Sequence, residues 1–424
     1  MYILEKVKKD NKFLLKVLFF LINITIISSI VGTAALNITI FLFDLIFIFF
    51  LLKNFKKFKF KPLLLYSFFL INIFLLFNVF FSYNLNSSLI TYFGIIKSFL
   101  FCFGALIIFS LNKKHFNSFI KIIFYTILFC SIDTLFQYLT GKDFFGFEKT
   151  HLDVGGGRLT GPFNTELVIG GFLAKVSFIS SLYFFSKKYT NFVPFFLFLL
   201  LIIVFLTNER APALMMFFSF LFFIIFFRSS LFKKKIKVLF IGGVFICIFL
   251  FVTLNDNLNQ RFIKKSLTQF GFLEKSYENE AGSFFDSQWG AHFLTAFEIF
   301  KDNPFIGAGL NTFRFTCVDA KYETIKSSNY KSRCSTHPHN TYLQILSELG
   351  LGGFIIVISL LIILVNKINN NINSNYKFLC LSILIFLFWP IQTTGSLFSS
   401  WNSYFYTLNI ILILYLTNVV KLKK

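Results

Sequence analysis

Two histidines stand two residues apart at the start of the stretch HPHNTYLQILSELG, which covers residues 337–350. Asn340 can cap the helix that the following apolar run predicts, so His339 would lie at the boundary between water and membrane, beside a helix N-terminus. A neutral imidazole there can accept a proton from a hydroxyl, because the helix dipole disfavours its charged form. The pattern therefore predicts His339 as a general base, with His337 beside it. A histidine that only caps or hydrogen-bonds is the alternative.

A zinc site is a further interpretation of this stretch, because His292 or His151 could join His337 and His339 as a third ligand. Divalent-metal mechanisms also use clustered carboxylates. The outer segments contain no DxD-like acidic pair, because their aspartates are scattered, at Asp153, Asp256, Asp286, Asp302 and Asp319. We therefore predict a site without a metal and without a cofactor.

Two other stretches join a Gly/Pro-rich turn to a helical run: RLTGPFNTELVIGGFLA at 158–174 and FKDNPFIGAGLNTF at 300–313. Each could present backbone N–H groups to an anion, with Arg158 and Arg314 at their edges. As turn chemistry alone the stretches are ordinary. They become informative because they fall on the same predicted side of a membrane as the histidines.

The elements that must position these residues are membrane helices. Of the 424 residues 56% are apolar and 14% are charged, whereas soluble domains have about 45–50% apolar and about 25% charged residues. This composition excludes a soluble enzyme, a DNA-binding protein and a secreted disulfide scaffold. Because one membrane helix takes about 20 residues, we predict an all-α integral membrane protein with about 12 transmembrane helices. The predicted spans are 13–31, 33–52, 63–82, 89–111, 117–139, 165–185, 192–207, 211–227, 236–254, 341–365, 376–393 and 400–418.

The charge distribution predicts the orientation of these helices. With the N-terminus in the cytoplasm, 23 of the 41 Lys and Arg residues fall inside, while 15 of the 19 acidic residues lie from Asp143 to Glu348, in the outer segments or at the outer ends of spans. The net charge of +22 is then an orientation signal, with both termini cytoplasmic, and not a sign of nucleic-acid binding. The chain divides into a membrane bundle at 1–254, a large periplasmic loop at 255–340 between the ninth and tenth helices, and a C-terminal membrane part at 341–424.

Arginine is distributed against this trend. Only Arg228 is predicted inside, and the outer arginines are Arg158, Arg210, Arg261, Arg314 and Arg333. A planar guanidinium binds phosphate through two parallel hydrogen bonds, so this set suits an anionic group held at the outer face. The alternative is that each arginine pairs with a nearby acid such as Glu209.

The large loop has two further features. Its segment 289–301 predicts an amphipathic helix, which lies on the membrane, caps a cavity or packs on the bundle. The apolar positions behind this prediction are Trp289, Phe293, Phe297 and Phe300. Cys317 and Cys334 share the loop and would face an oxidising compartment, so a disulfide between them is plausible. The other four cysteines lie in predicted spans.

Three ionisable residues, Asp44, Lys97 and Lys175, fall near the middle of predicted spans. Charged groups inside a membrane are energetically expensive and are usually paired or functional. We expect structural pairing, with the lining of a cavity as the alternative.

Taken in order, the three motif stretches and TNERAPAL at 207–214 resemble the O-antigen ligase and polymerase superfamily. Its members are integral membrane glycosyltransferases with about twelve helices and a large periplasmic loop late in the chain. The resemblance covers roughly 155–355 by motif. It implies transfer of a glycan from undecaprenyl pyrophosphate to an acceptor hydroxyl at the periplasmic face, without a nucleotide sugar or a metal. Ligase members use lipid A-core as the acceptor.

The resemblance also implies roles for individual residues. His339 is similar to the base that deprotonates the acceptor, and Arg210 and Arg261 are similar to residues that hold the pyrophosphate. Arg158, His337 and Asn340 are expected as further substrate contacts. The sequence departs from many members at Glu209, where they have a small polar residue, so the charge beside Arg210 differs from theirs.

The expected function is therefore an O-antigen ligase-like enzyme of the bacterial inner membrane, involved in lipopolysaccharide biosynthesis. A polymerase of repeat units and a protein O-oligosaccharyltransferase are alternatives within the superfamily, because only the acceptor differs. A transporter of polyprenyl-linked glycans or other solutes is the alternative from another class. Transporters commonly show inverted repeats and interrupted helices in corresponding halves, and neither is apparent in this sequence.

Overall fold

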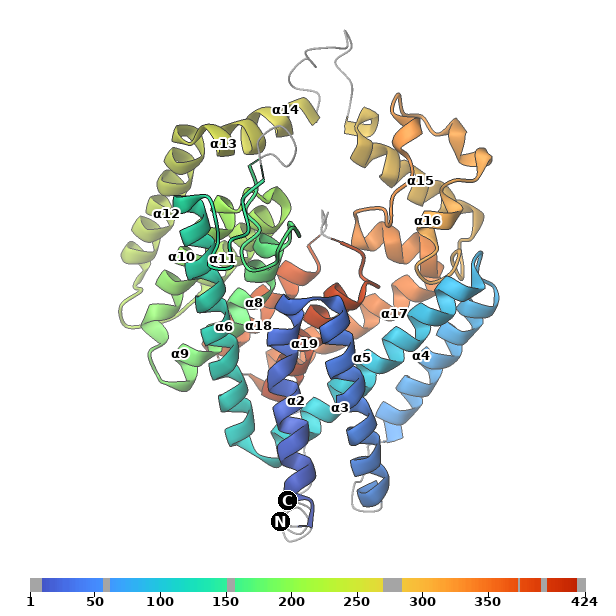
Figure 1. Ribbon diagram of the computed structural model, residues 1–424, viewed down its shortest axis with the longest axis horizontal. Helices are drawn as coiled ribbons and strands as arrows, with labels where there is room; N and C mark the ends of the chain where they lie inside the picture. Colours follow the sequence, from blue (N-terminus) through green and yellow to red (C-terminus); the bar gives the residue numbers. More distant parts are fainter. Residues whose placement is uncertain are drawn as a thin grey trace.

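The described part of the chain is helical throughout. The structure, a computed structural model, describes residues 10–55, 62–150, 157–269, 284–372, 374–389 and 395–417. These residues contain no β-strand and form only one isolated bridge, between Lys142 and Glu148. The predicted all-α class is thus confirmed (Figure 1).

The bundle helices come from both ends of the sequence. They are α2 (Lys12–Val31), α3 (Thr33–Asn54), α4 (Pro62–Phe80), α5 (Leu85–Leu111), α6 (Lys113–Thr140), α8 (Ile169–Ser180), α9 (Leu182–Ser186), α10 (Val193–Leu206), α11 (Arg210–Phe226), α12 (Lys234–Leu254), α17 (Thr341–Asn371), α18 (Ser374–Leu387) and α19 (Ser400–Leu416). Shorter elements lie between α12 and α17, namely α13 (Asp256–Leu258), η3 (Asn259–Lys264), α14 (Lys265–Gln269), α15 (Gln288–Asp302) and α16 (Phe313–Thr316).

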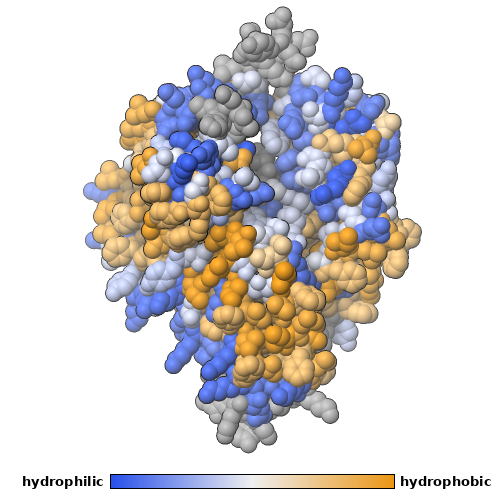
Figure 2. All heavy atoms as spheres, in the orientation of Figure 1, coloured by the Kyte–Doolittle hydropathy of each residue, from blue (hydrophilic) through white to orange (hydrophobic). Residues whose placement is uncertain are grey.

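Every predicted span overlaps one of these helices, and seven helical segments among the described residues are long and apolar enough to cross a membrane. Hydrophobic side chains cover much of the middle of the surface in Figure 2, while hydrophilic ones gather toward its ends. The chain is therefore a multi-pass membrane protein, and twelve crossings remain a prediction. The predicted span 341–365 ends too early, because α17 continues through the asparagine-rich stretch to Asn371.

Polar contacts define one end of the bundle. The Asn11 amide donates to Asn54 Oδ1 at 3.2 Å, which joins the start of α2 to the end of α3. The Asn371 amide donates to the Thr417 carbonyl at 3.2 Å, which joins the end of α17 to the end of α19. In Figure 1 the elements α13 to α16 lie at the opposite end. The elements of the predicted periplasmic loop thus lie at the end of the bundle away from these polar contacts.

The stretch at 300–313 folds onto α17 instead of presenting an open turn. Ala308 N–H donates to the Ser347 carbonyl at 2.8 Å, and Gly309 N–H donates to the Glu348 carbonyl at 3.0 Å. α17 is kinked at Gly350, whose φ is 64°. Here the helical pattern is interrupted, and the Leu351 N–H donates to the Pro304 carbonyl at 2.7 Å. The stretches at 300–313 and 337–350 therefore form one interlocked backbone unit.

Candidate active site

A cavity of 1910 Å³ opens at the end of the bundle that carries α13 to α16. Its wall combines apolar side chains of α2, α6 and α11 with polar side chains from the turn before α8, the start of α11 and the η3 to α14 region. The cavity thus has a hydrophobic part along the membrane helices and a charged part beyond their ends.

Three arginines predicted as substrate contacts line the charged part together: Arg158, Arg210 and Arg261. Arg210 donates to Ser266 Oγ at 3.1 Å and to Gln269 Oε1 at 2.9 Å. Arg261 Nε donates to the Asn208 carbonyl at 2.8 Å. Burial and the positive charges of Arg158 and Arg210 lower the pKa of Arg261 to about 10. Such crowding of like charges is costly without an anion to offset it.

Glu209 supplies one negative charge to this cluster. Its Oε1 accepts a hydrogen bond from Gly170 N–H at 2.7 Å, and its Oε2 accepts one from Gly171 N–H at 3.3 Å. Burial raises the pKa of Glu209 to about 7, against the opposing effect of these N–H groups, Lys175 and Arg158. The backbone N–H groups that the sequence predicts to bind an anion at the start of α8 therefore hold an internal carboxylate.

Lys175 lies beneath the same wall of the cavity and is only 4% exposed. Its Nζ donates to Asn402 Oδ1 at 2.8 Å and lies 4.7 Å from the centre of the Trp401 ring. Both alternatives for Lys175 are thus realised, since it has a structural partner and lines the cavity. Asn402 and Trp401 were not predicted as site residues, and their only sequence signal is polarity within an apolar run.

The other two ionisable residues of the spans lie away from the cavity. Lys97 Nζ donates to Asn37 Oδ1 at 2.5 Å and is within electrostatic range of Asp44. The expected structural pairing therefore applies to Lys97.

His339 lies in a cluster of rings contributed by α15 and the segment before α17. Its ring centre is 4.1 Å from that of His337 and 5.2 Å from that of His292, with the His292 ring nearly parallel to it. The Trp289 ring meets it edge-on at 4.7 Å. His339 Nε2 is 3.0 Å from Ser335 Oγ, with which it shares a hydrogen bond.

The backbone of His339 is in the left-handed region, with φ 56°. Non-glycine residues rarely adopt this conformation, and it often marks a functional site. The next residue, Asn340, caps α17 as predicted, because its Oδ1 accepts from Tyr342 N–H at 3.0 Å and from Leu343 N–H at 3.1 Å. The cap and the unusual backbone together fix the imidazole at the entrance of α17.

His292 and His337 are buried neighbours of this imidazole, at 0% and 6% exposed. Burial is the main cause that lowers the pKa of His292 to about 4 and that of His337 to about 3, with a smaller effect from His339. Both rings are therefore neutral at pH 7. Within the described ranges, no group of three or more His, Cys, Asp or Glu side chains is arranged to hold a metal ion. His151 lies outside those ranges.

His339 is not among the residues that line the cavity. Trp289 and Phe293 of α15 line it, and the Trp289 ring contacts His339. α15 forms the predicted helix, but its buried face consists of smaller residues such as Ala291, Ala296 and Ile299. The aromatic positions instead form a wall of the cavity at Trp289 and Phe293, and Phe297 is exposed. The interpretation of this helix as a cap on a cavity therefore fits best.

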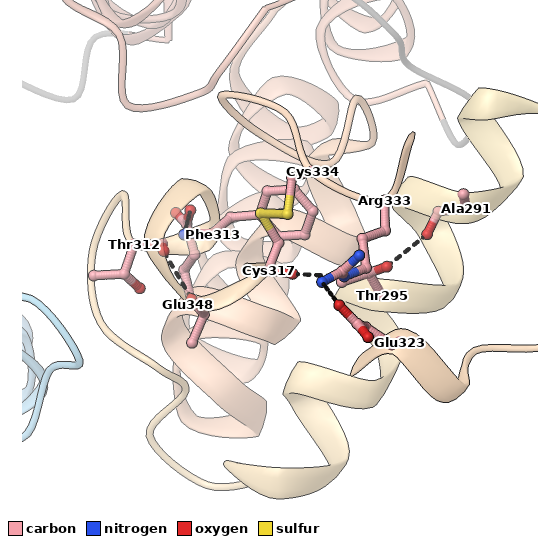
Figure 3. The surroundings of a disulfide bond; sticks show 10 residues. Ala291, Thr295, Thr312, Phe313, Cys317, Glu323, Arg333, Cys334 and Glu348 are labelled. Carbon is pink, nitrogen blue, oxygen red and sulfur yellow. Dashed lines mark hydrogen bonds and ion pairs between the residues drawn. A yellow bond between two sulfur atoms is a disulfide. The ribbon is translucent and has the colours of Figure 1, made fainter. Parts of the chain in front are cut away.

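Cys317 and Cys334 form a disulfide that ties the segment before His339 to the end of α16 (Figure 3). Beside it, Arg333 donates to the Cys317 carbonyl at 3.0 Å and to Glu323 Oε1 at 3.1 Å. Arg314 is exposed and donates to Asn311 Oδ1 at 3.4 Å. Neither arginine lines the cavity, so the structure divides the five outer arginines into three at the site and two outside it.

A second internal carboxylate was missed by the sequence analysis. Glu348 is fully buried in α17, and its oxygens accept from Asn311 N–H at 3.0 Å and from Phe313 N–H at 3.1 Å. Figure 3 shows Glu348 beside Phe313. The only sequence signal was an acid within the apolar run of α17. The expected anion site of the stretch at 300–313 is therefore also occupied from within the protein.

These features define an integral membrane protein with a cationic cavity at one end of its helix bundle and a histidine cluster behind one wall. Residues 195–358 match the O-antigen ligase family, which supports the expected relationship to the superfamily of O-antigen ligases and polymerases. The matched range includes Arg210, Arg261 and His339 but begins after Arg158. No curated protein matches the chain with significant similarity.

Proposed function

We propose that the chain transfers a glycan from a polyprenyl pyrophosphate, such as undecaprenyl pyrophosphate, to an acceptor hydroxyl. The observation that carries this proposal is the convergence of Arg158, Arg210 and Arg261 on one cavity that is apolar along the membrane helices. A polyprenyl pyrophosphate has this same division, with a charged headgroup and a hydrocarbon chain. Aromatic side chains such as Phe129 and Phe218 line the apolar part.

The reaction needs a base for the acceptor and positive charge for the leaving group. The acceptor oxygen forms a bond to the anomeric carbon, and the bond between that carbon and the pyrophosphate oxygen breaks. His339 takes the hydroxyl proton, and the electron pair of the broken bond leaves with the pyrophosphate. Because the arginines are already in place, they stabilise the charge that the leaving group gains. A single displacement inverts the configuration at the anomeric carbon.

In the proposal, Trp289 and Phe293 connect the pyrophosphate site with the base. Both residues form part of the cavity wall, together with the arginines, and the Trp289 ring contacts His339. The acceptor approaches along this wall and places its hydroxyl next to the imidazole. Neutral His292 and His337 add no charge that would oppose proton uptake by His339.

The proposed setting is the bacterial inner membrane, with the cavity on the periplasmic side and both termini in the cytoplasm. The proposed acceptor is lipid A-core, which makes the enzyme a ligase. A polymerase would use the same donor site and the same base with a growing glycan as acceptor.

Donor binding tests the arginine cluster directly. We expect Arg210→Gln and Arg261→Gln each to weaken binding of a fluorescent undecaprenyl-pyrophosphate glycan by about tenfold or more, since each removes a charged hydrogen-bond donor. The matched control is Arg314→Gln, which removes an arginine of the same outer segments that does not line the cavity. Equal weakening by all three variants would show that net charge alone drives binding and would contradict the assigned site.

A further inference from the structure

A second, smaller cavity of 450 Å³ lies where α11 ends and α12 begins. Arg228, Lys234 and Lys237 line it together with four residues that carry apolar surface, among them Phe232 and Val238. α11 starts at the arginine cavity and has 17 residues, so this basic pocket is about 25 Å away along the helix axis. It therefore lies toward the opposite membrane surface from the candidate active site.

The pocket is positively charged without any acidic residue of its own elements. The sequence contains no Asp or Glu between Glu209 and Asp256, and none after Glu348. The neighbouring helix α18 therefore contributes no carboxylate either. Lys237 is within electrostatic range of Arg228, so two like charges face one space. Such an arrangement favours a bound anion.

The walls of the pocket are held by specific contacts. Asn375 of α18 accepts a hydrogen bond from Arg228 N–H at 2.9 Å and donates one to the Arg228 carbonyl at 2.5 Å. Phe232 is 3% exposed and packs edge-on against the rings of Phe227 and Phe240. Lys237 Nζ donates to the Ile225 carbonyl at 3.0 Å, which joins the two helices across the pocket. The turn is therefore fixed while the Arg228 side chain stays exposed.

The surface that continues from the pocket is suited to hydrocarbon chains. Among the residues of α12 only Val244 and Val252 are buried, and Leu239 and Phe249 are 74% and 66% exposed. In a membrane this helix faces lipid along most of its length. A molecule with a phosphate group and acyl chains matches both the charged pocket and the exposed apolar face of α12. A free anion matches only the pocket.

We propose that the pocket formed by Arg228, Lys234 and Lys237 binds the phosphate headgroup of an anionic membrane phospholipid. The headgroup phosphate accepts hydrogen bonds from the Arg228 guanidinium and the lysine ammonium groups. The acyl chains lie against the exposed face of α12. The lipid thereby joins the α11–α12 turn to the bilayer at a site separate from that of the donor.

The test uses the full-length protein in nanodiscs of phosphatidylcholine with and without phosphatidylglycerol. We expect phosphatidylglycerol to raise the melting temperature and to remain bound in native mass spectra. The double variant Arg228→Gln with Lys237→Gln should lose both effects, while Arg228→Lys with Lys237→Arg should keep them because the charge is retained. The charge-matched control is Lys113→Gln with Lys114→Gln, which removes two lysines at the start of α6, outside the pocket.

Three results would overturn the proposal. One is a phosphatidylglycerol effect that survives in the Arg228 and Lys237 neutral variant. Another is an equal loss in the Lys113 and Lys114 control, which would show a general attraction between the basic end and the bilayer. The third is the same stabilisation by inorganic phosphate or glycerol phosphate in detergent, which would identify a site for a free anion instead of a lipid.

Discussion

The two buried histidines of the cluster predict how the free energy of unfolding depends on pH. The pKa values of His292 and His337, about 4 and about 3 in the folded protein, compare with about 6.5 for an unfolded histidine. Between these values the unfolded chain binds more protons, so folding stability falls as the pH falls below about 6.5. Each histidine contributes at most about 1.4 kcal/mol per pH unit.

Thermal unfolding of the wild type and His337→Asn between pH 5 and pH 7.5 measures this effect. Glu209 has a raised pKa and therefore contributes the opposite slope, so the histidine effect is read from the difference between the two proteins. The free energy of unfolding of the variant should depend on pH less steeply than that of the wild type, by the equivalent of about one bound proton. Identical slopes would mean that His337 is not buried as a neutral ring.

Glu209 predicts a second pH effect, on donor binding. Its carboxylate lies among the arginines, and with a pKa of about 7 it carries a charge above that pH and loses it below. A charged carboxylate repels the pyrophosphate, so we expect wild-type donor affinity to fall as the pH rises through about 7. Glu209→Gln should bind the donor about tenfold more tightly at pH 8.

The comparison of the two pH profiles isolates Glu209, because titration of the donor itself affects both proteins equally. Weaker binding by Glu209→Gln would show that the carboxylate serves mainly to hold the arginines in place.

At the site, the types of the functional residues could be predicted from the sequence, but their hydrogen-bond partners could not. His339 and the three arginines were identifiable because they stand out against apolar surroundings and against the distribution of lysine. That Glu209 and Glu348 fill the predicted anion sites depends on N–H groups 35 to 39 positions away in the sequence. No local pattern reveals such a pairing.

Among the elements, the interlocked unit of 303–313 and 347–352 predicts a strong effect of small substitutions. Gly307 has a φ of 75°, and a Cβ there would lie 2.3 Å from the carbonyl carbon of Glu348. Gly307→Ala therefore forces two backbones apart and should destabilise the protein by several kcal/mol, seen as lost expression or a much lower melting temperature. Gly242→Ala in α12 is the control, since its Cβ meets open space. A stable Gly307→Ala protein would contradict this packing.

Helix positions were predictable to within a few residues because apolar runs determine them, but their ends depend on caps. α5 begins at Leu85, four residues before the predicted start, because Asn84 Oδ1 accepts a hydrogen bond from Ser87 N–H at 3.0 Å. The kink at Gly350 was not predictable from the apolar pattern of α17. It arises from the backbone of 304–307, which packs against α17 from another part of the chain.

For the whole molecule, hydropathy and charge predicted a membrane protein with its chemistry at one end and its basic residues at the other. The arginine cavity is lined in part by residues of η3, α14 and α15. Figure 1 shows α13, α14 and α15 together at one end of the molecule. The cavity itself could not be predicted, because its wall combines α2, α6, α11 and α15, whose packing depends on contacts far apart in the sequence. The basic pocket at the start of α12 escaped prediction for the same reason.

Glycan transfer in proteoliposomes tests the central claim most directly. Purified protein is given a labelled undecaprenyl-pyrophosphate glycan and lipid A-core, and labelled product is measured together with donor binding. We expect transfer by the wild type and by Arg314→Gln, and a loss of at least about a hundredfold in His339→Asn with donor binding unchanged. Near-normal transfer by His339→Asn, with the donor bound, would contradict the assignment of this histidine as the base and with it the proposed site.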